Sequence, residues 1–182
     1  KDKEKIIVPE KLTEGFQLLP KNIPINLLLG NHDLETNVEI KKPVLFVGSN
    51  DTLEQGCYIT NQEINESKRL NIDFVLFKAQ MLPGGTLLLM IDTSMYSLKA
   101  DDYLSCYNVF LQQQNKPAVS DIEELRKMQR DFVVKNIQDH YNDIRHIIFV
   151  GHHPITALKY KGEKLILLDD IPFMLDMLRE VN

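Results

Sequence analysis

The apolar residues of this chain are gathered into short, nearly continuous segments, and each segment ends at residues that favour turns. Segments of this kind are typical of β-strands that are buried on both faces of a sheet. Strands are predicted at residues 25–29, 44–47, 74–77, 86–91, 146–150 and 165–168. Pro83, Gly84 and Gly85 separate two of these segments and predict an antiparallel hairpin. The sheet is therefore expected to be mixed rather than purely parallel.

Helices are predicted between the strands, where apolar residues recur at helical spacing. The clearest helix begins at Ser120, which matches a capping box with Glu123. Its apolar residues are Ile122, Leu125, Met128, Phe132 and Ile137. Further helices are predicted at residues 8–19, 100–116 and 172–181. Strands that alternate with helices indicate the α/β class.

Composition excludes several classes of protein. The 182 residues are 43% apolar and 26% charged, as in an ordinary globular domain, and one domain over residues 1–182 is expected. A net charge of -5 argues against a general nucleic-acid-binding surface, because basic side chains are needed to neutralise phosphates. The longest apolar run, 87–91, is far short of the roughly 18 residues that a membrane span needs, and no signal peptide is recognised.

The chain has two cysteines, Cys57 and Cys106. They have neither the spacing of a zinc knuckle nor the density of a disulfide-rich secreted domain. We therefore expect both thiols in the core and the protein in a reducing intracellular compartment, the cytoplasm.

Two loops carry most of the residues with catalytic chemistry, and each directly follows an apolar strand. The loops are Gly30-Asn31-His32-Asp33 and Gly151-His152-His153-Pro154. Three of the five histidines lie in them. In α/β sheets ligands bind outside the carboxyl ends of the strands, where loops converge on a rigid scaffold. A shared site formed by the two loops is therefore expected.

Each loop also has a purely structural interpretation. The first can be a simple turn, because Gly and Asn tolerate positive φ and Asp33 can cap a following helix. His152 and His153 can be a partly buried pair whose rings bond to backbone carbonyls. The common position after a strand favours the functional interpretation of both loops.

The order of these motifs resembles the calcineurin-like metallophosphoesterases, in their purple-acid-phosphatase-like form. The first loop is similar to the GNH[DE] motif and the second to the later GH-x-P motif. Between them, Asp92 and Thr93 end a strand as an Asp-Thr pair does in that family, and Gln129 and Phe132 match its Gln-x-x-aromatic helix. The resemblance covers residues 8–155 and implies a layered α/β/β/α sandwich with mixed sheets.

The resemblance also implies roles for single residues. Asn31 and His152 match ligands of a dinuclear site for two divalent ions, which can be Mn, Fe, Zn or Ni. His32 matches the histidine that faces the phosphate ester as a general acid or stabiliser, and Asp33 would hold its tautomer. Two such ions clamp a phosphate and activate a bridging water.

Other residues near the motifs receive structural interpretations. His153 is expected to be a supporting or packing residue, and Asp92 to cap the turn through Thr93 and Ser94. The charged run 159–164 is interpreted as a solvated loop, in which Lys161 is a candidate contact for an anionic substrate.

The chain lacks three motifs of the family. Asp-x-His, Gly-Asp and Gly-His-x-His, which supply the other ligands, do not occur in residues 1–182. Without them, Asn31 and His152 are expected to bind a metal pair weakly or not at all. Either the missing motifs lie before Lys1 and after Asn182, or the chain is a degenerate relative. The first explanation is favoured because Asn31, His32, Asp33 and His152 are all retained, whereas a degenerate site would have no reason to keep them together. The chain also begins without Met.

The resulting hypothesis is a metal-dependent phosphoesterase that hydrolyses phosphate mono- or diesters at a dinuclear metal centre. Residues 1–182 would be a single partial domain, truncated at both ends and inactive alone. The alternative is a non-catalytic structural or protein-interaction module on the same fold, because a fold does not by itself specify a function.

Overall fold

The computed structural model describes residues 6–7, 14–20, 22–30, 33–34, 45–46, 57–96, 100–153, 158–161 and 164–167. Within these ranges the chain is a mixed α/β structure, as the sequence predicts. Its longer α-helices there are α3 (Tyr58–Arg69), α4 (Leu104–Gln113) and α5 (Ile122–Asp139). The short 3-10 helices are η1 (Glu14–Leu18), η2 (Ser94–Tyr96) and η3 (Ala100–Tyr103).

The largest sheet in these ranges contains β5 (Lys78–Leu82), β6 (Thr86–Met90) and β7 (His146–Val150). β5 and β6 are antiparallel and β6 and β7 are parallel, so the sheet is mixed. The turn after β5 contains Gly84 and Gly85, whose φ angles of 85° and 77° favour glycine. The predicted hairpin is confirmed, but its first strand is β5 and not residues 74–77. The sequence pattern does not reveal β5 because Lys78 and the exposed Gln80 interrupt its apolar residues.

The remaining strands in the described ranges form three short pairs. β2 (Asn26–Leu27) is parallel to β4 (Asp73–Phe74), and β1 (Ile6–Ile7) is parallel to β3 (Leu45–Phe46). β8 (Leu158–Lys161) and β9 (Lys164–Leu167) form an antiparallel hairpin. The strands predicted at 25–29, 44–47 and 165–168 are therefore confirmed over part of their length. The solvated loop expected at 159–164 is wrong, because most of this run lies in β8 and β9.

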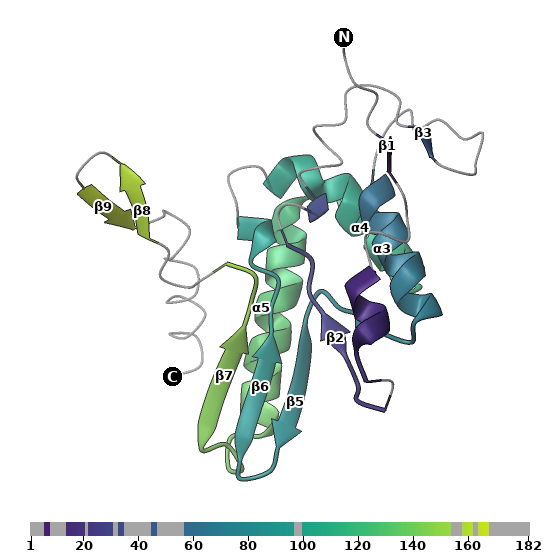
Figure 1. Ribbon diagram of the computed structural model, residues 1–182. Coiled ribbons are helices and arrows are strands. Elements are labelled where there is room, and N and C mark those ends of the chain that lie inside the picture. Colours follow the sequence, from purple (N-terminus) through teal and green to yellow (C-terminus); the bar gives the residue numbers. More distant parts are fainter. Residues whose placement is uncertain are drawn as a thin grey trace.

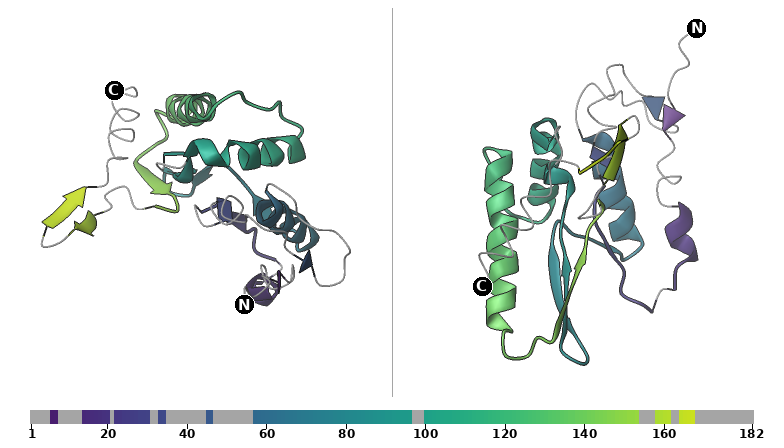
Figure 2. Two further views of the ribbon diagram at one scale, coloured as in Figure 1. Left: turned by 90° about the horizontal axis from the view of Figure 1, so that it is seen from above. Right: turned by 90° about the vertical axis from the view of Figure 1, so that its left-hand side faces the viewer.

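α5 runs along one face of the β5–β6–β7 sheet (Figures 1 and 2). Alternate residues of β6 and its extension point toward the helix: Leu87, Leu89 and Ile91 form a buried cluster with Val133 and Ile137. This alternation follows from the two-residue period of a strand, and the helical partners lie four residues apart on one face of α5. Burial of this cluster attaches the helix to the sheet.

The start of α5 differs by one residue from the prediction. Asp121 is the N-cap, and its carboxylate accepts a hydrogen bond from the Glu124 N–H at 2.9 Å. Glu124 in turn accepts from the Ser120 N–H at 2.9 Å. Two overlapping pairs with the spacing of a capping box are present in the sequence, and Asp caps a helix as well as Ser does.

α3 is a helix that the sequence pattern does not predict. Its buried positions include two polar residues, Thr60 and Ser67, beside Ile64. Ser67 Oγ donates to the Ile64 carbonyl at 2.8 Å, which satisfies the hydroxyl within the helix. A helix with so few apolar residues on its buried side has no clear hydrophobic stripe in the sequence.

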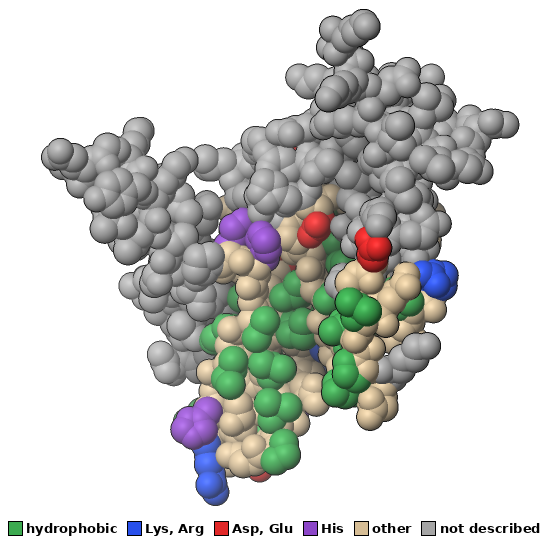
Figure 3. All heavy atoms as spheres, viewed as in Figure 1, with side chains coloured by type: hydrophobic (Ala, Val, Ile, Leu, Met, Phe, Trp, Pro, Cys, Tyr) green, Lys and Arg blue, Asp and Glu red, His purple; other side chains and the backbone are tan. Residues whose placement is uncertain are grey.

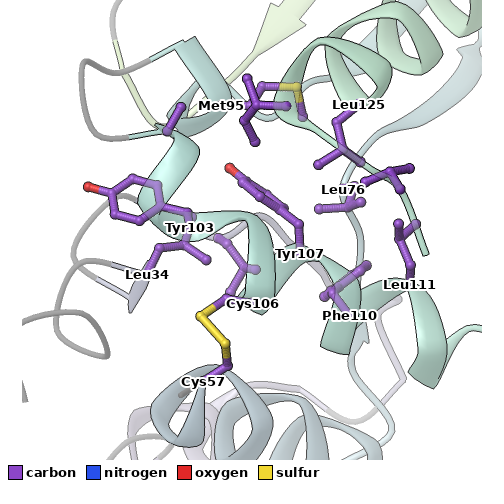
Figure 4. Packing of buried hydrophobic residues seen from close by; sticks show 14 of the residues in the cluster. Leu34, Cys57, Leu76, Met95, Tyr103, Cys106, Tyr107, Phe110, Leu111 and Leu125 are labelled. Carbon is purple, nitrogen blue, oxygen red and sulfur yellow. A yellow bond between two sulfur atoms is a disulfide. The ribbon is translucent and has the colours of Figure 1, made fainter. Parts of the chain in front are cut away.

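α3 and α4 meet in a second core cluster, drawn in Figure 4, in which Tyr103, Tyr107, Phe110 and Leu34 are buried. The helical segment expected within 100–116 is confirmed as η3 and α4. Cys57 and Cys106 are buried in this cluster, as expected, and they form a disulfide with a Cα–Cα distance of 4.9 Å. Their pairing was not expected from the sequence.

β7 is confirmed as a strand, but the prediction that it is buried on both faces is wrong. Ile148 and Val150 are 47% and 39% exposed. They pair with Leu88 and Met90, so they lie on the face of the sheet opposite α5. Figure 3 shows hydrophobic side chains over this face. α5 packs against the other face of the sheet, so it does not cover these two side chains.

The helix predicted at 8–19 is represented in the described ranges by η1, where Leu18 is 88% exposed and does not form the expected packed face. The helix predicted at 172–181 lies outside the described residues. None of the helices that the structure describes has both the length and the apolar character needed to cross a membrane.

Candidate functional site

The two loops singled out in the sequence meet at Gly30 and His152. A Cβ atom placed on Gly30 would lie 2.7 Å from both Cε1 and Nδ1 of His152. Such a distance is far below van der Waals contact, so the imidazole packs directly on the glycine backbone. Gly30 is buried and His152 is exposed, so the contact lies where the site opens to solvent. The structure therefore brings the strand end after β2 to the strand end after β7.

Asp33 shapes the first loop. Its Oδ2 accepts a hydrogen bond from the Gly30 N–H at 2.6 Å, closing the loop over three residues. Asp33 is itself helical and its carboxylate bonds backward along the chain, which differs from the cap of a following helix that the structural interpretation predicts. Asn31 and His32 lie outside the described residues, so the expected contact between Asp33 and His32 stays a prediction.

Thr93 holds the second loop. Its Oγ1 accepts from the His153 N–H at 2.8 Å and lies 3.0 Å from Nδ1 of the same histidine. The Thr93 methyl group fills the space beside Gly151, where an added Cβ would approach Cγ2 to 2.7 Å. His153 is therefore a supporting residue, as expected, and Thr93 is its partner. The sequence did not identify Thr93 in this role.

The rings of His152 and His153 contact each other edge to face, with centroids 4.7 Å apart. Side chains of neighbouring residues in an extended strand point to opposite sides, which is the arrangement that we expected. β7 ends at Val150, so His152 and His153 are not in an extended strand, and their rings lie on the same side in contact with each other.

The end of β6 is anchored from inside the protein. Asp92 Oδ1 accepts from the Ser94 N–H at 2.7 Å, which confirms the predicted turn through Thr93. Gln129 of α5 is buried, and its side-chain amide bonds to both the N–H and the C=O of Asp92, at 2.7 and 3.1 Å. A glutamine on the apolar stripe of the predicted helix was the sequence feature that could have indicated this anchor.

The electrostatics of Asp92 follow from its burial. Burial raises the pKa of its carboxyl to about 6, although hydrogen bonds from Ser94 oppose the shift. Oδ2 has no hydrogen-bond partner of standard geometry, and the same is true of the Tyr107 hydroxyl. Burial first and the Asp92 charge second raise the pKa of the Tyr107 hydroxyl. Such a carboxyl is stabilised in its neutral form.

The described residues do not assemble a complete metal site. No three His, Cys, Asp or Glu side chains in this part of the chain gather as potential ligands. Of the two ligands expected from the resemblance, His152 is described and exposed at the strand end, and Asn31 is outside the described residues. The imidazole of His152 fits one metal ion as a single ligand. Lys161 lies in β8, and its side chain is outside the described part.

Comparison of the sequence with models of known families and with curated proteins gives no match, and neither does comparison with solved structures. The likeness to calcineurin-like metallophosphoesterases therefore depends on the motifs in the sequence.

Proposed function

We propose that this protein is a metal-dependent phosphoesterase that hydrolyses phosphate mono- or diesters at a dinuclear metal centre, on a layered α/β/β/α sandwich. The observation that carries the proposal is the contact between Gly30 and the His152 ring. The two loops belong to different strands and are far apart in the sequence. Their meeting at a strand end, where ligands bind in α/β sheets, supports a shared site.

The roles follow the resemblance. Asn31 and His152 would hold divalent ions such as Mn, Fe, Zn or Ni, and His32 would face the substrate phosphate. When bound, the ions would clamp the phosphate ester and lower the pKa of a water molecule. A dinuclear centre needs further ligands besides Asn31 and His152, so the proposal is tested on the full-length protein.

The contribution of the described residues is to position these groups. Gly30 has no side chain, so the His152 ring can lie against the first loop. The bond from the Gly30 N–H to the Asp33 carboxylate connects the two ends of the tetrapeptide. Both contacts restrict the loops before a substrate binds. Catalysis by proximity and orientation requires such preorganised groups.

The test is hydrolysis of p-nitrophenyl phosphate and bis-p-nitrophenyl phosphate by the full-length protein with Mn, Fe, Zn or Ni, together with measurement of bound metal. His32→Ala should abolish most turnover and leave metal content unchanged, whereas Asn31→Ala should lower metal content. His146→Ala is the control, because His146 is exposed at the opposite end of β7. The reverse pattern for the two loop variants would overturn their roles.

The second candidate is a non-catalytic protein-interaction module. It is favoured by the exposed apolar side chains of Ile148 and Val150, since contiguous apolar surface often marks a contact with another protein. Absence of hydrolysis with all four metals, together with absence of bound metal in the full-length protein, would support this candidate.

A further inference from the structure

A continuous series of contacts joins the interior of the protein to the exposed ring of His152. It begins at Gln129, whose buried side chain bonds to both backbone groups of Asp92. The Asp92 carboxylate closes the next turn through the Ser94 N–H. Because the residue before Thr93 is fixed by α5 and the residue after it by this turn, the Thr93 backbone has little freedom.

Thr93 makes three contacts with the second loop. The hydroxyl bonds to the backbone and to the ring of His153, and the methyl group packs against Gly151. The Ile91 N–H also donates to the Val150 carbonyl at 2.9 Å, which continues the β6–β7 pairing up to this point. The start of the second loop is therefore held from the side of β6.

His152 lies between two of these fixed groups. The His152 ring packs on the Gly30 backbone. The rings of His152 and His153 contact each other edge to face. The ring of His152 thus contacts the ring of His153, and His153 in turn bonds to Thr93 through its backbone N–H and its ring.

We propose that Thr93 is a positioning residue of this site, which sets the orientation of the His153 ring and, through it, of His152. The step from His152 to metal binding rests on the proposed function; the positioning itself does not. The Thr93 oxygen accepts from the His153 N–H and lies 3.0 Å from Nδ1 of the ring, and we assign the Thr93 O–H as the donor to Nδ1, because this contact gives the hydroxyl proton an acceptor. A neutral His153 then carries its ring proton on Nε2.

The test compares Thr93→Val, which keeps the shape and removes the hydroxyl, with Thr93→Ser, which keeps the hydroxyl. The full-length, metal-free protein is labelled with 15N-histidine, and ring nitrogen shifts are recorded at a pH that keeps the imidazoles neutral. Signals are assigned with His153→Asn and His152→Asn. Wild type and Thr93→Ser should show His153 in the Nε2–H form, and Thr93→Val should show a mixture of tautomers and a shifted His152 signal.

Far-UV circular dichroism and thermal unfolding identify variants that do not fold. If Thr93→Val folds and its histidine signals equal those of wild type, the positioning role is wrong. Equal shifts in Thr93→Ser and Thr93→Val would overturn it as well, because the hydroxyl would then have no special effect.

A Mn2+ titration separates this inference from the proposed function. If His152 is a ligand, Thr93→Val should weaken Mn2+ binding about tenfold, as expected when a group that orients a ligand is removed. If wild type binds neither Mn2+ nor Fe, Zn or Ni while the ring shifts change as predicted, the phosphoesterase proposal fails and the positioning role stands. If wild type binds Mn2+ and Thr93→Val has the same affinity and the same ring shifts, the positioning role fails alone.

Discussion

Gln129 holds the backbone of Asp92 with both atoms of its side-chain amide: Oε1 accepts from the N–H at 2.7 Å and Nε2 donates to the C=O at 3.1 Å. Both residues are buried, so water does not replace these bonds if they are lost. The contact connects the helix that covers the sheet to the strand end that supports the candidate site.

Replacement of Gln129 by Met should destabilise the protein by about 3 kcal/mol. Met has a similar length but cannot bond to the peptide groups, and a buried donor or acceptor without a partner costs about 1–3 kcal/mol. The measurement is urea unfolding. Gln138→Met is the matched control, because Gln138 is exposed on the same helix, and it should change stability by less than about 0.5 kcal/mol. Equal effects of both variants would mean that the contact does not stabilise the fold.

Replacement of Asp92 by Asn should change how stability depends on pH. Burial raises the pKa of the folded-state carboxyl to about 6 from the ordinary value of 3.8. Between about pH 4 and 6 the folded protein keeps a proton that the unfolded chain has released, so stability falls as the pH rises through this window. The difference between the two pKa values corresponds to about 3 kcal/mol, lost above about pH 6.

Asp92→Asn removes this titration and keeps an oxygen that can accept from the Ser94 N–H. Relative to the variant, wild type should therefore lose about 3 kcal/mol between pH 4 and pH 7. Urea unfolding of both proteins across this range gives the difference directly. Asp101→Asn, at an exposed position in η3, controls for loss of a carboxylate. A difference that stays constant with pH would contradict the prediction.

Replacement of Gly30 by Ala should impair the site more than the fold. The added Cβ would lie 2.7 Å from the His152 ring, and the exposed ring must move away. Because an exposed side chain can move into solvent, the free energy of unfolding should change by less than about 1 kcal/mol. Metal content and phosphoesterase activity of the full-length protein should fall. The control is Gly15→Ala, because no atom lies within 4 Å of a Cβ added to Gly15. Wild-type metal affinity in Gly30→Ala would argue against a role for the contact.

Loss of the Cys57–Cys106 disulfide should destabilise the protein. The bond closes a loop with a sequence separation of 49, for which chain-entropy arguments give about 4 kcal/mol. The measurement is urea unfolding of wild type and of Cys57→Ser/Cys106→Ser, each with and without dithiothreitol. The reductant should affect only wild type. Equal sensitivity of both proteins would contradict a stabilising role.

The disulfide also bears on the compartment in which the protein works. The sequence favours a reducing compartment, whereas disulfides persist mainly in oxidising ones. Alkylation of denatured, unreduced protein from its natural source, followed by mass spectrometry of the peptides that carry Cys57 and Cys106, decides between them. We expect neither of these two cysteines to be alkylated if the bond persists there, and both to be alkylated if the compartment is reducing.

Several elements could be predicted because their local pattern is strong. The segment 146–150 is a strand with the predicted bounds, and the Pro-Gly-Gly loop turns the chain between β5 and β6. The helix after Ser120 is also present as α5. In each case an uninterrupted apolar run, a turn with glycine at positive φ or a helical stripe specifies the element from neighbouring residues alone.

α3 and the burial of β7 could not be predicted in this way. The helix buries Thr60 and Ser67: Thr60 Oγ1 donates to the Asp33 carbonyl, a contact that only the folded chain provides, whereas Ser67 Oγ donates to the Ile64 carbonyl within the helix. β7 has the composition of an interior strand but has one β-neighbour within the described residues. Burial depends on what lies beside a strand, and a pattern within the strand does not contain that information.

The sequence by itself determined the α/β class, the strand ends that carry Gly30 and His152, and the turn closed by Asp92, because these depend on short-range spacing and backbone preference. Only the tertiary structure decided that Gly30 meets the His152 ring, that Thr93 holds His153 and that Cys57 pairs with Cys106. Each of these contacts joins residues that are distant in the chain. Their proximity is set by how helices and strands pack around a common core, which no local pattern encodes.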